Sequence, residues 1–140
     1  MHLQTVTDPT DHSTCVLTYE EAAQCLVLTW KGFVGPSMAQ RGGETYLEHA
    51  LAWPSPFLLN DNTQLHGPWF DGLDWLAAVW APQAARLGLR YVAHVVQADA
   101  RFDTITQQMP APAPFELQIF QDVAEARRWL RDCRATVHAA

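Results

Sequence analysis

The sequence predicts an α/β fold, in which a five-stranded mixed sheet is flanked by helices. Short β-branched and aromatic runs alternate with longer segments of helical periodicity, in the order β-β-α-β-α-β-(α)-β-α. The first two runs are joined by a short polar connection, so they predict an antiparallel edge on a mostly parallel sheet. Hydrophobic residues make up 49% of the 140 positions, which is ample for the core of one domain.

The N-terminal segment provides the antiparallel hairpin. Residues 1–14 are polar and have no period, so we expect an N-terminal tail or a loose first strand. Residues 15–19 and 25–31 are rich in β-branched and aromatic residues and predict two strands. The domain is expected to span residues 15–134, with a C-terminal tail at residues 135–140.

The first helix is predicted from Pro36 to about Leu51. Proline is favoured at the start of a helix because its missing N–H has no helical partner there. Gly42 and Gly43 inside this helix each cost about 1 kcal/mol relative to Ala. Either the helix packs closely against a neighbour at these glycines, or it begins after them.

The central strand is predicted at Phe57–Leu59, an apolar run followed by a polar rim of four residues, Asn60, Asp61, Asn62 and Thr63. A buried parallel strand delivers polar groups to one edge of the sheet, where α/β folds keep their sites. We therefore expect the polar rim to hold a ligand or a partner. The alternative is that Asp61 and Asn62 only bond local backbone N–H groups in a turn.

The next helix has the clearest amphipathic period. Pro82 is expected to bend it and Gly88 to end it. Its apolar stripe consists of Leu73, Leu76, Ala77, Trp80, Ala84 and Leu87.

The C-terminal part adds two strands and the last helix. Residues 91–96 predict a second buried strand, and residues 115–120 alternate as an edge strand does. Between these strands, residues 99–108 could form a short helix, and residues 109–114 predict a stiff extended linker. Residues 122–125 form a capping box that opens the last helix.

The last helix also carries four arginines, Arg127, Arg128, Arg131 and Arg134. They could bind phosphate. Alternatively they form a solvated face, since positive charge near a helix C-terminus is favourable by itself.

Charge and cysteine content exclude several classes of protein. The net charge of −6 argues against nucleic-acid binding, which usually needs a basic surplus. Three scattered cysteines without a C-x-x-C motif indicate reduced thiols in the cytoplasm. No apolar leader and no run of 18 apolar residues occurs, so we expect no integral membrane association. Clustered metal ligands and a cofactor loop are missing, so neither a metal nor a cofactor is expected.

Four local patterns, in this order, resemble the STAS-like (SpoIIAA-like) bacterial family, also described as having a CRAL-TRIO-like fold. They are LTWKGF at residues 28–33, LNDN at 59–62, WAPQA at 80–84 and DVAEARRWL at 122–130. The resemblance implies a non-enzymatic switch, in which an Asp-Ser-Ser step after the central strand carries a phosphorylated serine that faces a partner protein. Here the step reads Asp61-Asn62-Thr63, so only Thr63 has a hydroxyl that could take a phosphate.

Aromatic residues bracket the polar rim on both sides. Trp69 and Phe70 precede the apolar stripe of the long helix and are candidates for a pocket or a subunit interface. Trp30, Phe57 and Trp80 are expected to line an apolar cavity between the sheet and the long helix, if the protein carries a ligand.

We therefore expect a non-catalytic cytoplasmic binding or regulatory module. It would act at the polar rim through a protein partner or through self-association as a homodimer. The second hypothesis is a carrier or sensor of a small apolar, lipid-like ligand. An enzyme comes third, because the sequence shows no activated nucleophile, and His94, inside an apolar strand, is expected to be a hydrogen-bonded core histidine.

Overall fold

A computed structural model describes residues 1–66, 73–97 and 113–139 and contains one mixed sheet. Its six strands follow one another in chain order across the sheet. They are β1 (His2–Thr7), β2 (Thr14–Glu20), β3 (Cys25–Gly32), β4 (Phe57–Leu65), β5 (Tyr91–Val95) and β6 (Glu116–Phe120). The pairs β1–β2 and β2–β3 are antiparallel, and every later pair is parallel.

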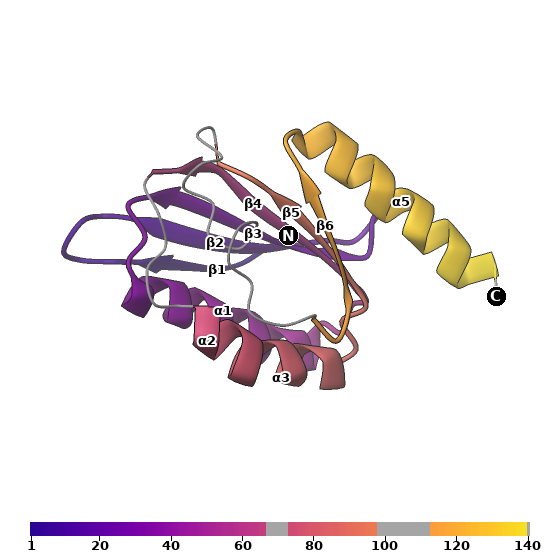
Figure 1. Ribbon diagram of the computed structural model, residues 1–140, viewed down its shortest axis with the longest axis horizontal. Coiled ribbons are helices and arrows are strands. Elements are labelled where there is room, and N and C mark those ends of the chain that lie inside the picture. Colours follow the sequence, from indigo (N-terminus) through magenta and orange to yellow (C-terminus); the bar gives the residue numbers. More distant parts are fainter. Residues whose placement is uncertain (67–72, 98–112, 140) are drawn as a thin grey trace.

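The helices cover the two faces of the sheet. Helices α1 (Pro36–Ala52), α2 (Leu73–Trp75) and α3 (Ala81–Arg86) lie on one face, whereas α5 (Val123–Ala139) lies on the other (Figure 1). The predicted α/β architecture is thus present, with six strands instead of five. The sixth strand is β1, so of the two alternatives for residues 1–14, a tail or a loose first strand, the strand is present, and it buries Val6 beside Cys15. At the other end, α5 continues to Ala139, beyond the predicted limit at residue 134.

Helix α1 begins at Pro36, as predicted, and its two glycines explain how it packs. A Cβ atom on Gly42 would overlap the Cη2 atom of Trp30, and one on Gly43 would lie 2.8 Å from Cζ3 of Trp75. Both glycines therefore let an indole ring lie directly against the helix backbone. Of the two alternatives that the sequence left open, close packing is correct.

The long amphipathic helix contains a π-helical segment, η1 (Leu76–Trp80), between α2 and α3. The backbone N–H of Ala81 bonds to the carbonyl of Leu76, five residues earlier. Pro82, which has no N–H to donate, follows directly, so the irregularity lies where a bend was predicted. Helix α3 ends at Arg86, and Gly88 just beyond it, with a φ of +109° and backbone bonds to the last turn, forms a Schellman motif.

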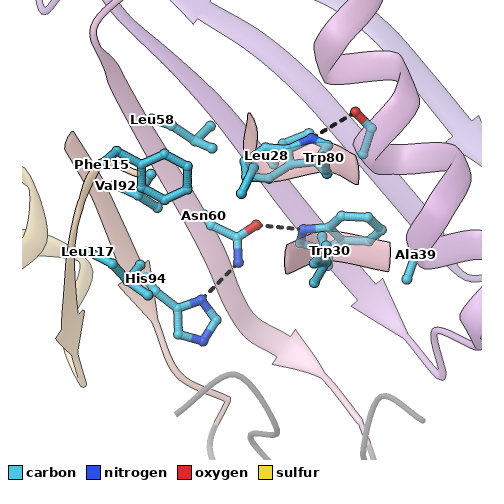
Figure 2. Close-up of a pocket in the computed structure, with 13 residues that line it drawn as sticks. Leu28, Trp30, Ala39, Leu58, Asn60, Trp80, Val92, His94, Phe115 and Leu117 are labelled. Carbon is cyan, nitrogen blue, oxygen red and sulfur yellow. Dashed lines mark hydrogen bonds between the residues drawn. The ribbon is translucent and has the colours of Figure 1, made fainter. Parts of the chain in front are cut away.

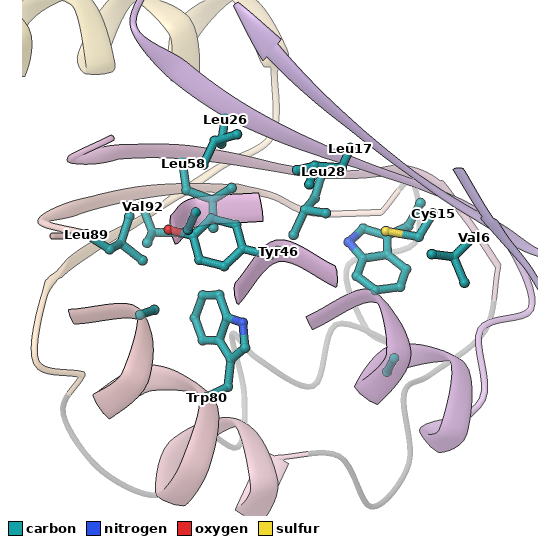
Figure 3. Close-up of a cluster of buried hydrophobic side chains, with 14 of the residues drawn as sticks. Val6, Cys15, Leu17, Leu26, Leu28, Tyr46, Leu58, Trp80, Leu89 and Val92 are labelled. Atoms are coloured by element: carbon teal, nitrogen blue, oxygen red, sulfur yellow. The ribbon is translucent and has the colours of Figure 1, made fainter. Parts of the chain in front are cut away.

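The main core lies between the sheet and the α1–α3 face. Tyr46 of α1 and Trp80 of η1 meet there with ring centroids 5.3 Å apart (Figure 3). A second cluster fills the α5 face, where Phe57 stacks on Tyr91 at 5.7 Å. Side chains alternate along each strand, so neighbouring residues of β4 belong to different clusters.

Two sequence predictions lie outside the described residues, namely the helix at residues 99–108 and most of the linker at residues 109–114. In the described part of the chain, no helix has the length and apolar character needed to cross a membrane.

Candidate functional site

Three neighbouring strands bring a tryptophan, an asparagine and a histidine to the same face of the sheet. In the parallel register Asn60 of β4 is paired with His94 of β5, and with Leu28 of β3, two residues before Trp30. All three polar side chains point towards the α1–α3 face (Figure 2). They are buried, with 2% of Trp30, 8% of Asn60 and 1% of His94 exposed.

Asn60 is the centre of a hydrogen-bond chain across these strands. The indole Nε1–H of Trp30 donates to Oδ1 of Asn60 at 2.8 Å. The Nδ2 amide of Asn60 lies 3.0 Å from Nδ1 of His94 (Figure 2). The same amide donates to Oδ1 of Asn62 at 3.2 Å. An amide N–H₂ can only donate, so Nδ1 of His94 accepts, and a neutral His94 carries its proton on Nε2. His94 is therefore the hydrogen-bonded core histidine that its apolar run predicted.

This polar chain forms one wall of a mostly apolar cavity. The cavity has a volume of about 70 Å³ and lies between β3, β4 and β5 on one side and α1, η1 and α3 on the other. Its apolar lining includes Leu28, Leu58, Leu76, Trp80, Val92 and Leu117. The indole N–H of Trp80 bonds to the carbonyl of Gly43 at 3.0 Å, so its polar atom is satisfied by the main chain.

The expected aromatic lining is only partly present. Trp30 and Trp80 line the cavity. Phe57 does not, because it belongs to the cluster on the α5 face. The reason is the two-residue period of β4, which directs Leu58 and Asn60 towards the cavity and Phe57 away from it.

The polar rim differs from its sequence prediction. We expected the strand to end before Asn60, but β4 continues to Leu65 and stays paired with β3 as far as Gly32. Asn60 and Asn62 are consequently buried inside the sheet rather than presented at its edge.

Asp61 and Thr63 alternate with these two asparagines and are half-buried. Oδ1 of Asp61 accepts from the backbone N–H of Thr63 at 2.9 Å and from its hydroxyl at 2.7 Å. Asp61 therefore bonds a local backbone N–H, but within strand β4 and not in a turn. Trp69 and Phe70 lie outside the described residues.

The thiols on the sheet are poor nucleophiles. Burial raises the pKa of both Cys15 and Cys25 to about 12. Both side chains are consequently protonated near neutral pH, whereas a nucleophilic cysteine needs a thiolate. Among the described residues, no group of three or more His, Cys, Asp or Glu side chains is placed to hold a metal ion.

Comparison with solved structures identifies the fold. A crystal structure of an uncharacterised DUF3478-family protein with a SpoIIAA-like fold, from Shewanella loihica PV-4, matches the chain with a TM-score of 0.52. The chain has a SpoIIAA-like fold. The two sequences are 19% identical, and the match covers 89% of this chain and 98% of that chain, so the likeness shows the fold alone. The SpoIIAA-like resemblance seen in the sequence is confirmed at this level.

Comparisons of sequence add no further relative. No protein-family model matches the chain, and a search of the curated proteins finds no similar sequence.

Proposed function

We propose that this protein is a non-catalytic binding module that holds a small, mainly apolar ligand in the cavity between the sheet and the helical segments α1, η1 and α3. The observation that carries the proposal is the buried amide of Asn60, held between Trp30 and His94 on the wall of an apolar cavity. An unpaired buried amide costs about 1–3 kcal/mol by mutational measurements, so these bonds are needed to keep Asn60 there. They also fix its orientation, as a binding site requires.

The size of the cavity limits the ligand. Pockets for drug-sized molecules have volumes of about 300–1,000 Å³, whereas a single water needs about 10–15 Å³. A cavity of about 70 Å³ therefore suits a short aliphatic or ring fragment with one hydrogen-bonding group. The ligand is thus smaller than the lipid-like molecule that the sequence suggested.

The proposal can be tested by NMR titration with phenol and cyclohexanol as probes. We expect saturable shifts of the Trp30 indole and Asn60 amide resonances, since both groups belong to the cavity wall. Ala39→Leu should abolish these shifts, because Ala39 lines the cavity and a larger side chain fills it. Ala52→Leu is the matched control, as Ala52 lies in the same helix but is exposed. Shifts that are absent in the unaltered protein, or that persist in Ala39→Leu, would refute the proposal.

A second candidate function, binding of a protein partner or self-association, is favoured by one exposed aromatic residue. Phe33 follows β3 and is 67% exposed, and its ring lies 5.9 Å from that of His66, which follows β4. Aromatic side chains are enriched at protein interfaces relative to the rest of the surface. Sedimentation of the unaltered protein and of Phe33→Ala tests this candidate, and identical monomeric profiles over a wide concentration range would count against self-association.

A further inference from the structure

A second cavity lies on the opposite face of the sheet, far from the Asn60 amide. It has a volume of about 310 Å³ and is formed by α5 and the turn that joins β2 to β3. Its apolar lining consists of Ala22, Ala23, Cys25 and Leu130. We call it the arginine groove, because the remaining described residues that line it are Arg127, Arg131 and Arg134.

The sequence of α5 places these arginines together. Positions 127, 131 and 134 are separated by four and three residues, so they follow one face of the helix. Leu130 on the same side is buried against the sheet and fixes the orientation of this face. The described lining contains no acidic residue, although the chain as a whole has a net charge of −6. The arginine groove is therefore a local positive site on an acidic protein.

Two of the three guanidinium groups are anchored to the other side of the groove. Arg127 forms an ion pair with Glu20 and bonds both carboxylate oxygens, at 2.9 Å for Oε2. Arg134 donates to the backbone carbonyl of Ala22, an uncharged acceptor, and it has no ion-pair partner among the described residues. These bonds tie α5 to the β2–β3 turn and hold both side chains across the groove.

Arg131 lies between the two anchored arginines. It makes no hydrogen bond or ion pair with any part of the chain that the structure describes. Glu20 compensates Arg127, whereas Arg131 and Arg134 have no acidic partner in the part of the chain that the structure describes, so their charges are available to a ligand. Guanidinium groups bind phosphate through paired N–H donors, and a phosphate monoester near neutral pH carries close to two negative charges.

We propose that the arginine groove binds an organic phosphate monoester. Its phosphate would accept hydrogen bonds from Arg131 and Arg134, and its short apolar part would lie against Cys25 and Leu130. The volume of about 310 Å³ is at the lower end of the range of about 300–1,000 Å³ found for small-molecule sites, which suits such a ligand. This site is independent of the ligand proposed for the Asn60 cavity.

Isothermal titration calorimetry of the full chain with phenyl phosphate tests the proposal. We expect saturable binding that Arg131→Gln weakens by roughly tenfold or more, as expected for lost charge-assisted hydrogen bonds. Arg128→Gln is the matched control, since it removes the same charge from an exposed residue of α5 that does not line the groove. Its effect should stay below about twofold, because the attraction between exposed charges is screened by salt.

Further titrations distinguish specific binding from general electrostatic attraction. Inorganic phosphate should bind more weakly than phenyl phosphate, because it cannot use the apolar lining. Glu20→Gln should tighten phenyl phosphate binding, because it releases the charge of Arg127. The proposal is overturned if phenyl phosphate does not bind saturably, or if Arg128→Gln weakens binding as much as Arg131→Gln does. Circular dichroism of each variant shows whether it is folded.

Discussion

Replacing Gly42 by Ala tests the packing that shapes the proposed ligand cavity. An added Cβ would overlap Cη2 of Trp30 and lie 2.8 Å and 3.0 Å from Cζ3 and Cζ2 of the same ring. These ring atoms belong to the buried core, although the indole also lines the proposed cavity, so the ring cannot keep its place once the Cβ is added. The indole must therefore shift, and its Nε1–H, which bonds to Asn60 at 2.8 Å, must shift with it.

The expected loss of stability combines two destabilising contributions with one stabilising contribution. Overpacking of a core costs about 1–3 kcal/mol, and weakening the bond between Trp30 and Asn60 costs about 1 kcal/mol more. The better helix propensity of Ala offsets about 1 kcal/mol. We expect Gly42→Ala to lower the free energy of unfolding by about 1–3 kcal/mol, and Tm by about 3–10 °C.

Urea denaturation followed by circular dichroism measures this change. Gly35→Ala is the matched control, because Gly35 has an ordinary φ of −81° and an added Cβ there meets no atom within 4 Å. Its free energy of unfolding should change by less than about 1 kcal/mol. In a Trp30→Phe background, the smaller ring should make Gly42→Ala much less costly. The reasoning fails if Gly42→Ala is as stable as the unaltered protein, or if the Trp30→Phe background makes no difference.

Three other predictions concern the buried polar groups and thiols. Iodoacetamide at pH 8 should label half-buried Cys133 before Cys15 and Cys25, because burial raises the pKa of the latter two thiols to about 12. Peptide mass spectrometry that finds all three cysteines modified at the same time in the native protein would contradict this. The stability that these two thiols provide is complete below the unfolded pKa of 9.0 and is lost as the pH rises towards 12. Urea midpoints should therefore fall over this range, and Cys25→Val should flatten the decline. Asn60→Leu removes the bonds to both neighbouring strands and should lower the free energy of unfolding by about 1–3 kcal/mol. Thr63→Val, which removes a half-buried hydroxyl, should lower it less. Equal losses would show that the buried hydrogen bonds of Asn60 contribute no more to stability than the bond of Thr63.

Most of the architecture could be predicted because it depends on local patterns. The hairpin and the helix start at Pro36 follow from periodicity and from proline geometry, which neighbours in the sequence determine. Strand β1 cannot be told from a tail by its sequence, because its residues are mostly polar and only Val6 is buried. An edge strand with one buried side chain leaves almost no periodic signal.

The end of the central strand was predicted wrongly for a different reason. Four polar residues after an apolar run usually mark an exit from the core, yet Asn60 and Asn62 stay inside it. Asn60 bonds to partners in other strands, Trp30 in β3 and His94 in β5, at separations of about thirty residues, and Asn62 in turn accepts from Asn60. One signal was available, since Asn60 falls on the same face as Leu58 in a strand period of two. The distant hydrogen-bond partners themselves could not be read from one segment.

The sheet order β1-β2-β3-β4-β5-β6 also has a consequence for biosynthesis. As the ribosome releases the chain, each new strand finds its neighbour already made, and no strand has to be inserted between two earlier ones. The nascent sheet can therefore grow in one direction, from the N-terminal hairpin towards β6. Until β4 emerges, however, β3 has an open parallel edge, and such unpaired edges favour aggregation during folding.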